Sequence, residues 1–254
     1  MLELAHGDVA VSIVPERGAI VSSVRVAGRE LLYMDAATLA NPTQNVRGGI
    51  PILFPFCGKL ANETFELTGT RMKQHGFGRN KAWAISERAA GWARMTLAAD
   101  AETRAQWPYE FTAEHTVTVV PGGVQLELAI RASDAALPVS PGWHPYLTIA
   151  AADKAKVSGD VPQFSADRLG DDREFDFGIS APADGRATFD LPGTGRVRLG
   201  FSPEMKHLQF WSQPGKPFIC LEPFHGPANT VNTDGRFWVP ANQARTFWMR
   251  LQLL

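Results

Sequence analysis

Two residues far apart in the chain have the chemistry of a proton-transfer pair. Glu222 follows the apolar run of residues 218–221 and precedes a proline. An apolar strand that ends in Glu-Pro leaves a partly desolvated carboxylate at the sheet margin, where its pKa can rise enough for a general base near neutral pH. His144, between Trp143 and Pro145, supplies an imidazole that can give or take a proton in the same range. Each of these residues is therefore a candidate for proton transfer.

Two further segments surround polar side chains with glycine and proline, a composition typical of rigid loops that border a pocket. They read RGGIP at residues 47–51 and QHGFGR at residues 74–79. Guanidinium, amide and imidazole groups can hold hydroxyls or an anion. The polar side chains expected to border such a pocket include Arg47, Gln74, His75 and Arg79.

Several familiar signatures are absent from the sequence. Residues 193–198 lack the third glycine of a dinucleotide-binding loop, and neither GxxxxGK[ST] nor GxSxG occurs. None of the six histidines stands in an HxH or HxxxH pair, so a metal site would have to combine distant segments. Nucleotide binding and serine-hydrolase chemistry are therefore not expected, and neither is a bound metal.

The elements that must position these groups are strands, because hydrophobic residues repeat with period two. Residues 111–120 and 124–131 alternate apolar and polar types on either side of a Pro-Gly-Gly turn, which predicts a β-hairpin. The same alternation predicts strands at residues 9–14, 20–26, 92–97, 196–201, 208–211 and 247–253. No segment shows a capped amphipathic helix longer than a turn or two. The expected fold is an all-β sandwich of two large antiparallel sheets.

Length and composition agree with one compact unit. The chain has 254 residues, 44% of them hydrophobic, which is enough for a core that needs no disulfide or metal. No linker or internal repeat interrupts residues 1–254, which are expected to form a single domain. The polar, Asp-rich residues 151–186 predict a long excursion over the surface. Cys57 and Cys220 stand in no CxxC pattern and are expected to be reduced thiols.

Charge and hydropathy exclude some partners. Lys and Arg total 25 against 26 Asp and Glu, a formal charge of -1, which provides no general attraction to nucleic acid. Neither a signal sequence nor a run of about 18 apolar residues occurs, so no membrane span is predicted, and a soluble, cytoplasmic protein is expected. Monomer and homodimer both stay open.

The chemistry-bearing segments occur in an order that resembles a known family. RGGIP (47–51), QHGFGR (74–79), WHPYL (143–147) and CLEP (220–223) are similar to the motifs of the aldose 1-epimerase (galactose mutarotase) superfamily. The similarity is closer to its branch of hexose-6-phosphate mutarotases and LacX-like bacterial proteins, and it covers residues 47–229. This resemblance implies a galactose-mutarotase-like β supersandwich, no cofactor, and interconversion of the α and β anomers of a free sugar or a sugar phosphate.

The resemblance also implies roles for individual residues. Glu222 would take the proton from the anomeric hydroxyl, and His144 would protonate the ring oxygen. The residues that would hold sugar hydroxyls or an attached anion are Arg47, Gln74, His75 and Arg79. Galactose mutarotases use a further aspartate to grip sugar hydroxyls, and five candidates for it stand in this chain: Asp160, Asp167, Asp171, Asp172 and Asp176.

Other functions fit the same residues. A non-catalytic sugar-binding β sandwich would keep the aromatics and arginines but needs neither an acid nor a base. A metal-dependent β-fold enzyme would use His75, His144 and Glu222 as ligands. Structural interpretations also stay open: Glu222 as a surface carboxylate, His144 as a satisfied core histidine, His115 and His6 as structural residues, and Trp143, Phe56 and Phe77 as either a sugar-stacking wall or core packing.

Cations gather in sequence around the two loop motifs. They are Arg47, Arg79 and Lys81 in or beside the motifs and Lys59, Arg71 and Lys73 between them. A chain with little net charge that concentrates cations locally has a means of attracting an anion. A modest preference for a 6-phosphorylated or otherwise anionic hexose is therefore expected, the alternative being that these cations only solvate a hairpin.

Overall fold

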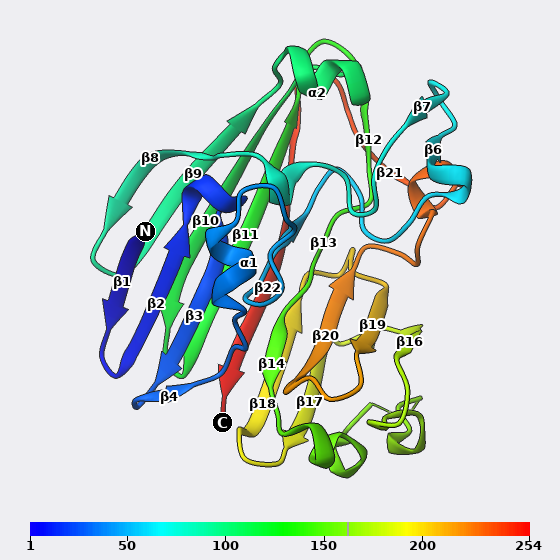
Figure 1. Cartoon of the computed structure of the whole chain (residues 1–254). Coiled ribbons are helices and arrows are strands. Elements are labelled where there is room, and N and C mark those ends of the chain that lie inside the picture. The colour runs from blue at the N-terminus through cyan, green and yellow to red at the C-terminus, as the bar shows by residue number, and fades with distance from the viewer. Residues whose placement is uncertain (162) are drawn as a thin grey trace.

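The computed structural model describes residues 1–161 and 163–254, and most of its elements are antiparallel strands (Figure 1). The largest sheet has eight strands in the order β15-β17-β18-β22-β11-β10-β9-β8. In that order their bounds are Ser158–Gly159, Arg186–Leu191, Gly195–Phe201, Ala244–Leu253, Gly123–Ala132, Phe111–Val120, Trp92–Ala98 and Ala84–Ala89.

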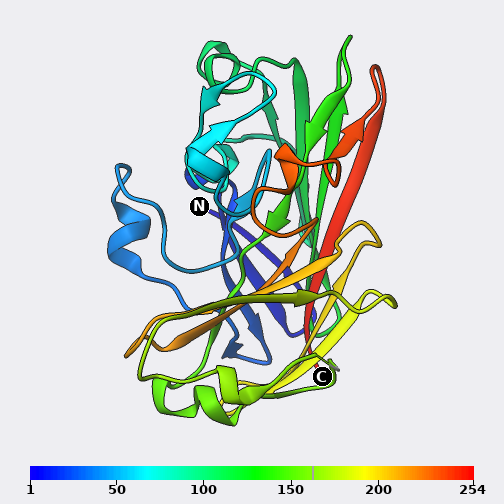
Figure 2. The same cartoon turned by 90° about the vertical axis from the view of Figure 1, so that its right-hand side faces the viewer.

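Two smaller sheets form a second layer. One has the order β1-β2-β3-β4, with bounds Leu2–His6, Val9–Val14, Ile20–Val26 and Arg29–Glu30. The other has the order β16-β19-β20-β13-β5, with β14 also paired to β20, and its bounds are Phe175–Ser180, His207–Ser212, Phe218–Phe224, Gly142–Trp143, Ile52–Leu53 and, for β14, Tyr146–Thr148. Turned by 90°, the molecule shows the long strand β22 (red) on one side and the blue β1–β4 and orange β20 on the other (Figure 2). The predicted all-β sandwich is confirmed.

Short elements complete the described part of the chain. Two small strand pairs join β12 (Leu137–Val139) to β21 (Phe237–Val239) and β6 (Thr64–Phe65) to β7 (Thr70–Arg71). Neither α-helix, α1 (Ala36–Ala40) or α2 (Ala101–Gln106), reaches two turns, as predicted. The 3-10 turns are Pro15–Arg17, Ala61–Glu63, Gly78–Asn80, Ala151–Lys156, Ala166–Arg168 and Thr230–Asn232. Among the described residues no helix combines the length and apolar character needed to cross a membrane.

The period-two pattern located the strands accurately. All eight predicted strands are present, and the largest difference is at β22, which begins at Ala244 rather than at residue 247. The predicted hairpin pairs β10 with β11 from Phe111 opposite Ala132 to Val120 opposite Gly123. Along β10 buried and half-buried residues alternate strictly, because one face meets the core and the other meets solvent.

The predicted surface excursion at residues 151–186 is only partly correct. Residue 162 lies outside the described residues, and residues 151–156 and 166–168 do form isolated turns. However, β16 (Phe175–Ser180) pairs with β19 along six residues and forms the edge of the six-stranded sheet. Its alternation, with Phe175, Phe177 and Ile179 buried, is short and follows a polar run, so it was missed.

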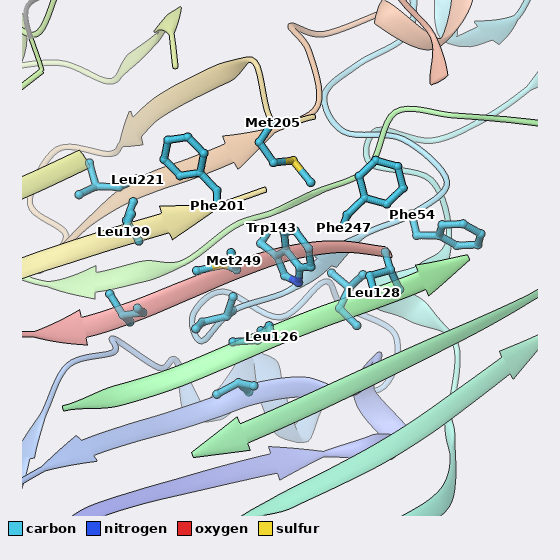
Figure 3. Packing of buried hydrophobic residues seen from close by; sticks show 14 of the residues in the cluster. Phe54, Leu126, Leu128, Trp143, Leu199, Phe201, Met205, Leu221, Phe247 and Met249 are labelled. Carbon is cyan, nitrogen blue, oxygen red and sulfur yellow. The ribbon is translucent and has the colours of Figure 1, made fainter. Parts of the chain in front are cut away.

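The core lies between the two layers. One cluster of buried side chains extends from Leu2 to Leu251. In Figure 3, Leu128 of β11 and Phe247 and Met249 of β22 occupy the space between the layers with Leu221 of β20. Cys57 and Cys220 are both buried and unbridged, as expected. His115 is fully buried on the core face of β10, which agrees with a structural role, whereas His6 is exposed.

Candidate active site

One pocket of about 300 Å³ brings the predicted site residues together, at the lower end of the size of small-molecule sites. Six of its lining residues were predicted from sequence: Arg47, Gln74, His75, Arg79, His144 and Glu222. They come from segments separated by as many as 175 residues, and the six-stranded sheet with its adjoining loops places them side by side.

Glu222 lies within a strand rather than at its end. β20 continues to Phe224, so the expected position at the sheet margin is wrong, and the side chain is only 2% exposed. In the register Glu222 stands opposite Gln209 of β19. Burial, reinforced by the negative charge of Asp176, holds the pKa of the Glu222 carboxyl well above its ordinary value. Burial therefore favours the neutral acid at this position.

His144 stands directly beside that carboxyl. Its Nε2 lies 3.5 Å from Oε2 of Glu222, and its ring stacks on Tyr146 with the centroids 4.7 Å apart. The ring's Nδ1 is buried and has no hydrogen-bond partner in the described part of the chain. Burial, with the nearby charge of Arg79, lowers the pKa of His144 to about 3. The structure thus favours a neutral imidazole, and the two groups lie side by side in the pocket.

His75 is held by the backbone of a neighbouring loop. Its Nδ1 accepts a hydrogen bond from the Gly58 N–H at 3.0 Å, and burial keeps its pKa well below the ordinary histidine value. A neutral His75 must then carry its proton on Nε2. The following residue, Gly76, has φ +64°, and a Cβ there would lie 2.4 Å from the Phe54 carbonyl oxygen. A glycine is therefore required for this loop to approach the Phe54 backbone so closely.

The two arginines of the motifs lack carboxylate partners among the described residues. Arg79 donates from Nη2 to the Gln74 carbonyl at 3.1 Å, but no described residue accepts a hydrogen bond from its buried Nε. Burial lowers the pKa of Arg79 to about 10, which still leaves it charged at neutral pH. The Arg47 guanidinium lies 5.7 Å from the centre of the Trp211 ring. Arg79 is half-buried and Arg47 is exposed, and cations without counter-charges are available to bind an acceptor-rich ligand.

Not every predicted cation reaches the pocket. Lys59 lines it, whereas Lys81 forms ion pairs with Asp100 at 3.0 Å and Glu102 at 2.7 Å. Arg71 pairs with Glu63 at 2.6 Å on the small β6–β7 hairpin. Sequence proximity to the motifs was therefore a poor guide, because carboxylates distant in sequence or across a hairpin neutralise these side chains.

The aromatic wall of the pocket differs from the expected one. Trp143, Phe56 and Phe77 belong to the buried core, so core packing is the correct interpretation for them. Trp211 of β19 and Phe224 of β20 line the pocket instead. They were missed because each stands in an apolar strand where nothing in sequence distinguishes a pocket-facing ring from a core ring.

Two acidic residues of the pocket were also missed or left unassigned. Asp176 on β16 lines the pocket and accepts a hydrogen bond from Nε2 of Gln209 at 2.5 Å. Glu174 accepts from Nε1 of Trp211 at 2.7 Å. Asp176 is the one of the five candidate aspartates that lines this pocket in the described part of the chain. The alternation of residues 175–180 was the available signal, since it puts Asp176 opposite the buried phenylalanines.

The three metal ligands of the alternative interpretation, His75, His144 and Glu222, do not form one cluster in the described part of the chain. In the described part of the chain, the possible ligand atoms that gather within 4.8 Å of one another belong to His144, Cys220 and Glu222, not to His75. Burial and the nearby Glu222 hold the pKa of the Cys220 thiol well above its ordinary value. A metal at this position would have to displace protons from both the thiol and the carboxyl.

Comparisons with known proteins agree on one family. The sequence profile described as Aldose 1-epimerase matches residues 1–237. Curated relatives named "Putative glucose-6-phosphate 1-epimerase" include one from Salmonella typhimurium, 26% identical over 178 residues that cover 68% of this chain and 56% of the relative. Another, from Escherichia coli, is 28% identical over 163 residues that cover 62% of this chain and 51% of the relative. The matched segment thus spans about half the length of these relatives.

Solved structures show the same fold. The Slr1438 protein of Synechocystis sp. PCC 6803 is 29% identical with a TM-score of 0.89, over 99% of this chain and 94% of that one. A galactose mutarotase-like protein from Lactobacillus casei is 20% identical with a TM-score of 0.81, over the whole of both chains. With the profile match across nearly the full sequence, the chain belongs to the aldose 1-epimerase family, a family of isomerases.

Proposed function

We propose that the protein is an aldose 1-epimerase that interconverts the α and β anomers of a hexose or an anionic hexose. The observation that carries the proposal is the pairing of Glu222 Oε2 with His144 Nε2 at 3.5 Å in a polar pocket. Ring opening of a cyclic sugar needs one proton to leave O1 and another to reach O5. Because both oxygens are bonded to C1, two groups side by side can serve both.

The pair needs to hold one proton between its members. Burial favours that proton on Glu222 and leaves His144 neutral. A bound anomeric hydroxyl that donates to Glu222 favours the ionised carboxylate, so the proton can pass to His144 Nε2. Glu222 then takes the O1 proton while His144 protonates O5. After rotation about C1–C2 in the open aldehyde, the reverse transfers close the other anomer and restore the pair.

The remaining polar side chains would hold the sugar. The guanidinium groups of Arg47 and Arg79 and the Nε2–H of His75 donate to hydroxyl oxygens, and Gln74 can both donate and accept. Asp176 is the proposed carboxylate that accepts from sugar hydroxyls, since it lines the same pocket as the acid–base pair. These roles follow the family resemblance, and the shared pocket supports them.

The charges of the pocket support an anionic substrate. Arg47, Lys59 and Arg79 line it, and none of the three makes an ion pair with a described carboxylate. Glucose 6-phosphate is the substrate in the printed names of the curated relatives. We therefore propose a modest preference for a 6-phosphorylated hexose over the neutral sugar.

The test is anomer exchange with freshly dissolved glucose, galactose and glucose 6-phosphate, followed by polarimetry or NMR. The expected result is catalysed exchange with a higher kcat/KM for the phosphorylated sugar. Lys59→Ala and Arg79→Ala should reduce that advantage. Arg71→Ala is the matched control, because it removes a cation already paired with Glu63.

Two outcomes would change the conclusion. Sugar binding without any catalysed exchange would indicate the non-catalytic carbohydrate-binding sandwich. Equal kcat/KM values for the two sugars, unaffected by Lys59→Ala and Arg79→Ala, would leave a neutral-aldose mutarotase without an anion clamp.

A further inference from the structure

A chain of three polar side chains crosses the strands next to the pocket. His207 and Gln209 lie two residues apart on β19, so they project from the same face of that strand. Nε2 of His207 is 2.8 Å from Oε1 of Gln209, and Nε2 of Gln209 donates to Oδ1 of Asp176 at 2.5 Å. Gln209 and Asp176 line the pocket, whereas His207 does not.

The neighbouring side chains hold His207 in place. Its ring lies nearly parallel to that of Phe224, with centroids 6.2 Å apart and an interplanar angle of 25°. On the other side is Gly178 of β16, where a Cβ would lie 2.0 Å from His207 Cε1 and 2.7 Å from Gln209 Oε1. Any larger residue at position 178 would displace both groups. The fold therefore leaves a space shaped for this imidazole and this amide.

The direction of the chain follows from donors and acceptors. Gln209 offers its NH2 to the carboxylate, which can only accept, so its oxygen must face His207. The imidazole can then contribute only by donating from Nε2, which makes Nε2–H the required tautomer in the neutral ring. The carboxylate thus fixes which way the Gln209 amide points, and a proton on Nε2 of His207 supports that same orientation.

We propose that His207 is a positioning residue that acts through Gln209 to hold the Asp176 carboxylate toward the bound sugar. The inference rests on the proposed function, because it gives Asp176 a sugar hydroxyl as its partner. Asp176 is itself exposed, so without the amide its side chain could turn toward solvent. The Gln209 amide restricts it to the rotamer that faces the pocket. His207 touches neither the sugar nor the reacting atoms in this arrangement.

The first experiment reads the proton directly and needs no activity. In ¹⁵N NMR of the full-length protein at neutral pH, His207 should be the Nε2–H tautomer. Gln209→Met, which keeps the length of the side chain and removes the amide, should change the His207 ring shifts and the Asp176 carboxyl ¹³C shift. An Nδ1–H tautomer in the wild type, or an Asp176 signal unchanged in Gln209→Met, would overturn the proposal.

The second experiment separates positioning from catalysis. His207→Phe keeps the ring between Phe224 and Gly178 but removes the donor, and it should raise KM for the sugar about 5- to 15-fold while kcat changes by less than about 2-fold. His207→Gln restores a donor and should recover part of the affinity. Exposed His6→Phe on β1 is the control and should change neither constant.

A double substitution tests whether His207 acts through the carboxylate. Asp176→Asn combined with His207→Phe should have the KM of Asp176→Asn alone, because the second change has nothing left to position. Additive effects, or an unchanged KM in His207→Phe, would refute the proposal that His207 positions Asp176 through Gln209. Absence of catalysed exchange in the wild type would instead refute the proposed function. The NMR result alone would then test whether His207, Gln209 and Asp176 are linked by hydrogen bonds.

Discussion

Strands β10 and β20 show two ways in which a strand can be specified. β10 alternates buried and half-buried residues along its whole length, whereas every residue of β20 is buried. The difference arises because one face of the eight-stranded sheet meets solvent, while the six-stranded sheet has the core on one face and the pocket on the other. A strand with one solvent-exposed face can be recognised from its alternating sequence. A strand whose residues are all buried lacks that alternation, but an ionisable residue within it is a candidate for the active site.

The two strands also carry their buried polar groups differently. His115 on β10 is fully buried, and neither ring nitrogen has a hydrogen-bond partner among the described residues. Glu222 on β20 is buried beside His144, Asp176 and Arg79, each of which influences or contacts it. An isolated buried polar group only lowers stability, whereas a set of interacting ionisable groups in a pocket is typical of an active site.

The largest effect should come from removing the acid–base pair. Glu222→Gln and His144→Asn each keep the approximate shape and remove the proton-transfer function, so each should lower kcat for anomer exchange by about 10²-fold or more. Thermal unfolding should stay close to that of the wild type. If both variants kept near wild-type rates, the proposed acid–base roles of Glu222 and His144 would be wrong.

A core substitution in the eight-stranded sheet should have the opposite signature. Leu128 is fully buried on β11, and Leu128→Ala should lower the free energy of unfolding by about 2–5 kcal/mol through lost burial and a cavity. The folded fraction should keep its kcat, since Leu128 does not line the pocket. Urea unfolding and initial rates on the same preparation provide both numbers. A large fall in kcat at unchanged stability would contradict this division between the sheets.

The same contrast explains what could be predicted from the sequence. The hairpin of β10 and β11 was predicted almost to the residue because its alternation is uninterrupted. Glu222 and His144 were found as the polar residues inside apolar segments, and the motifs pointed to Arg47 and His75. Each of these segments can be recognised within about ten residues, and the order of the four motifs along the chain implied the roles of their residues.

The rest depends on contacts between distant segments. Trp211 lines the pocket because β19 pairs with β20, and Asp176 does so because β16 pairs with β19. Lys81 does not line the pocket, and it forms ion pairs with Asp100 and Glu102 instead. Strand order across the sheet determines all three placements, and no local pattern encodes that order.

His115 should make stability depend on pH without affecting catalysis. Burial lowers its pKa to about 3, so in mild acid the unfolded chain binds a proton that the folded chain does not. The neutral buried ring costs no stability above the unfolded pKa of about 6.5, and the free energy of unfolding falls as the pH drops toward 3. The loss at pH 5 is about 2 kcal/mol. His115→Leu should therefore lose less stability than the wild type between pH 7 and pH 5.

Urea unfolding at the two pH values measures this difference. His6→Leu is the matched control, because it removes an exposed imidazole without touching the core. His75 and His144 also have lowered pKa values, so His115→Leu should reduce the dependence rather than abolish it. An unchanged pH dependence in His115→Leu would show that the buried ring is accommodated in another way.

The smallest expected effect concerns the charge of Asp176. Its carboxylate helps to raise the pKa of Glu222, second to burial itself. Anomer exchange should lose activity at high pH when the pair loses its shared proton, an apparent pKa that belongs to the pair. Asp176→Asn removes a like charge and should move this alkaline limb of kcat to lower pH. Asp172→Asn, an exposed change on the same segment that does not line the pocket, should leave the limb in place. A limb that stayed fixed or moved upward in Asp176→Asn would contradict this prediction. The charge of Asp176 would then not raise the pKa of Glu222, and Asp176 would serve only to bind the sugar.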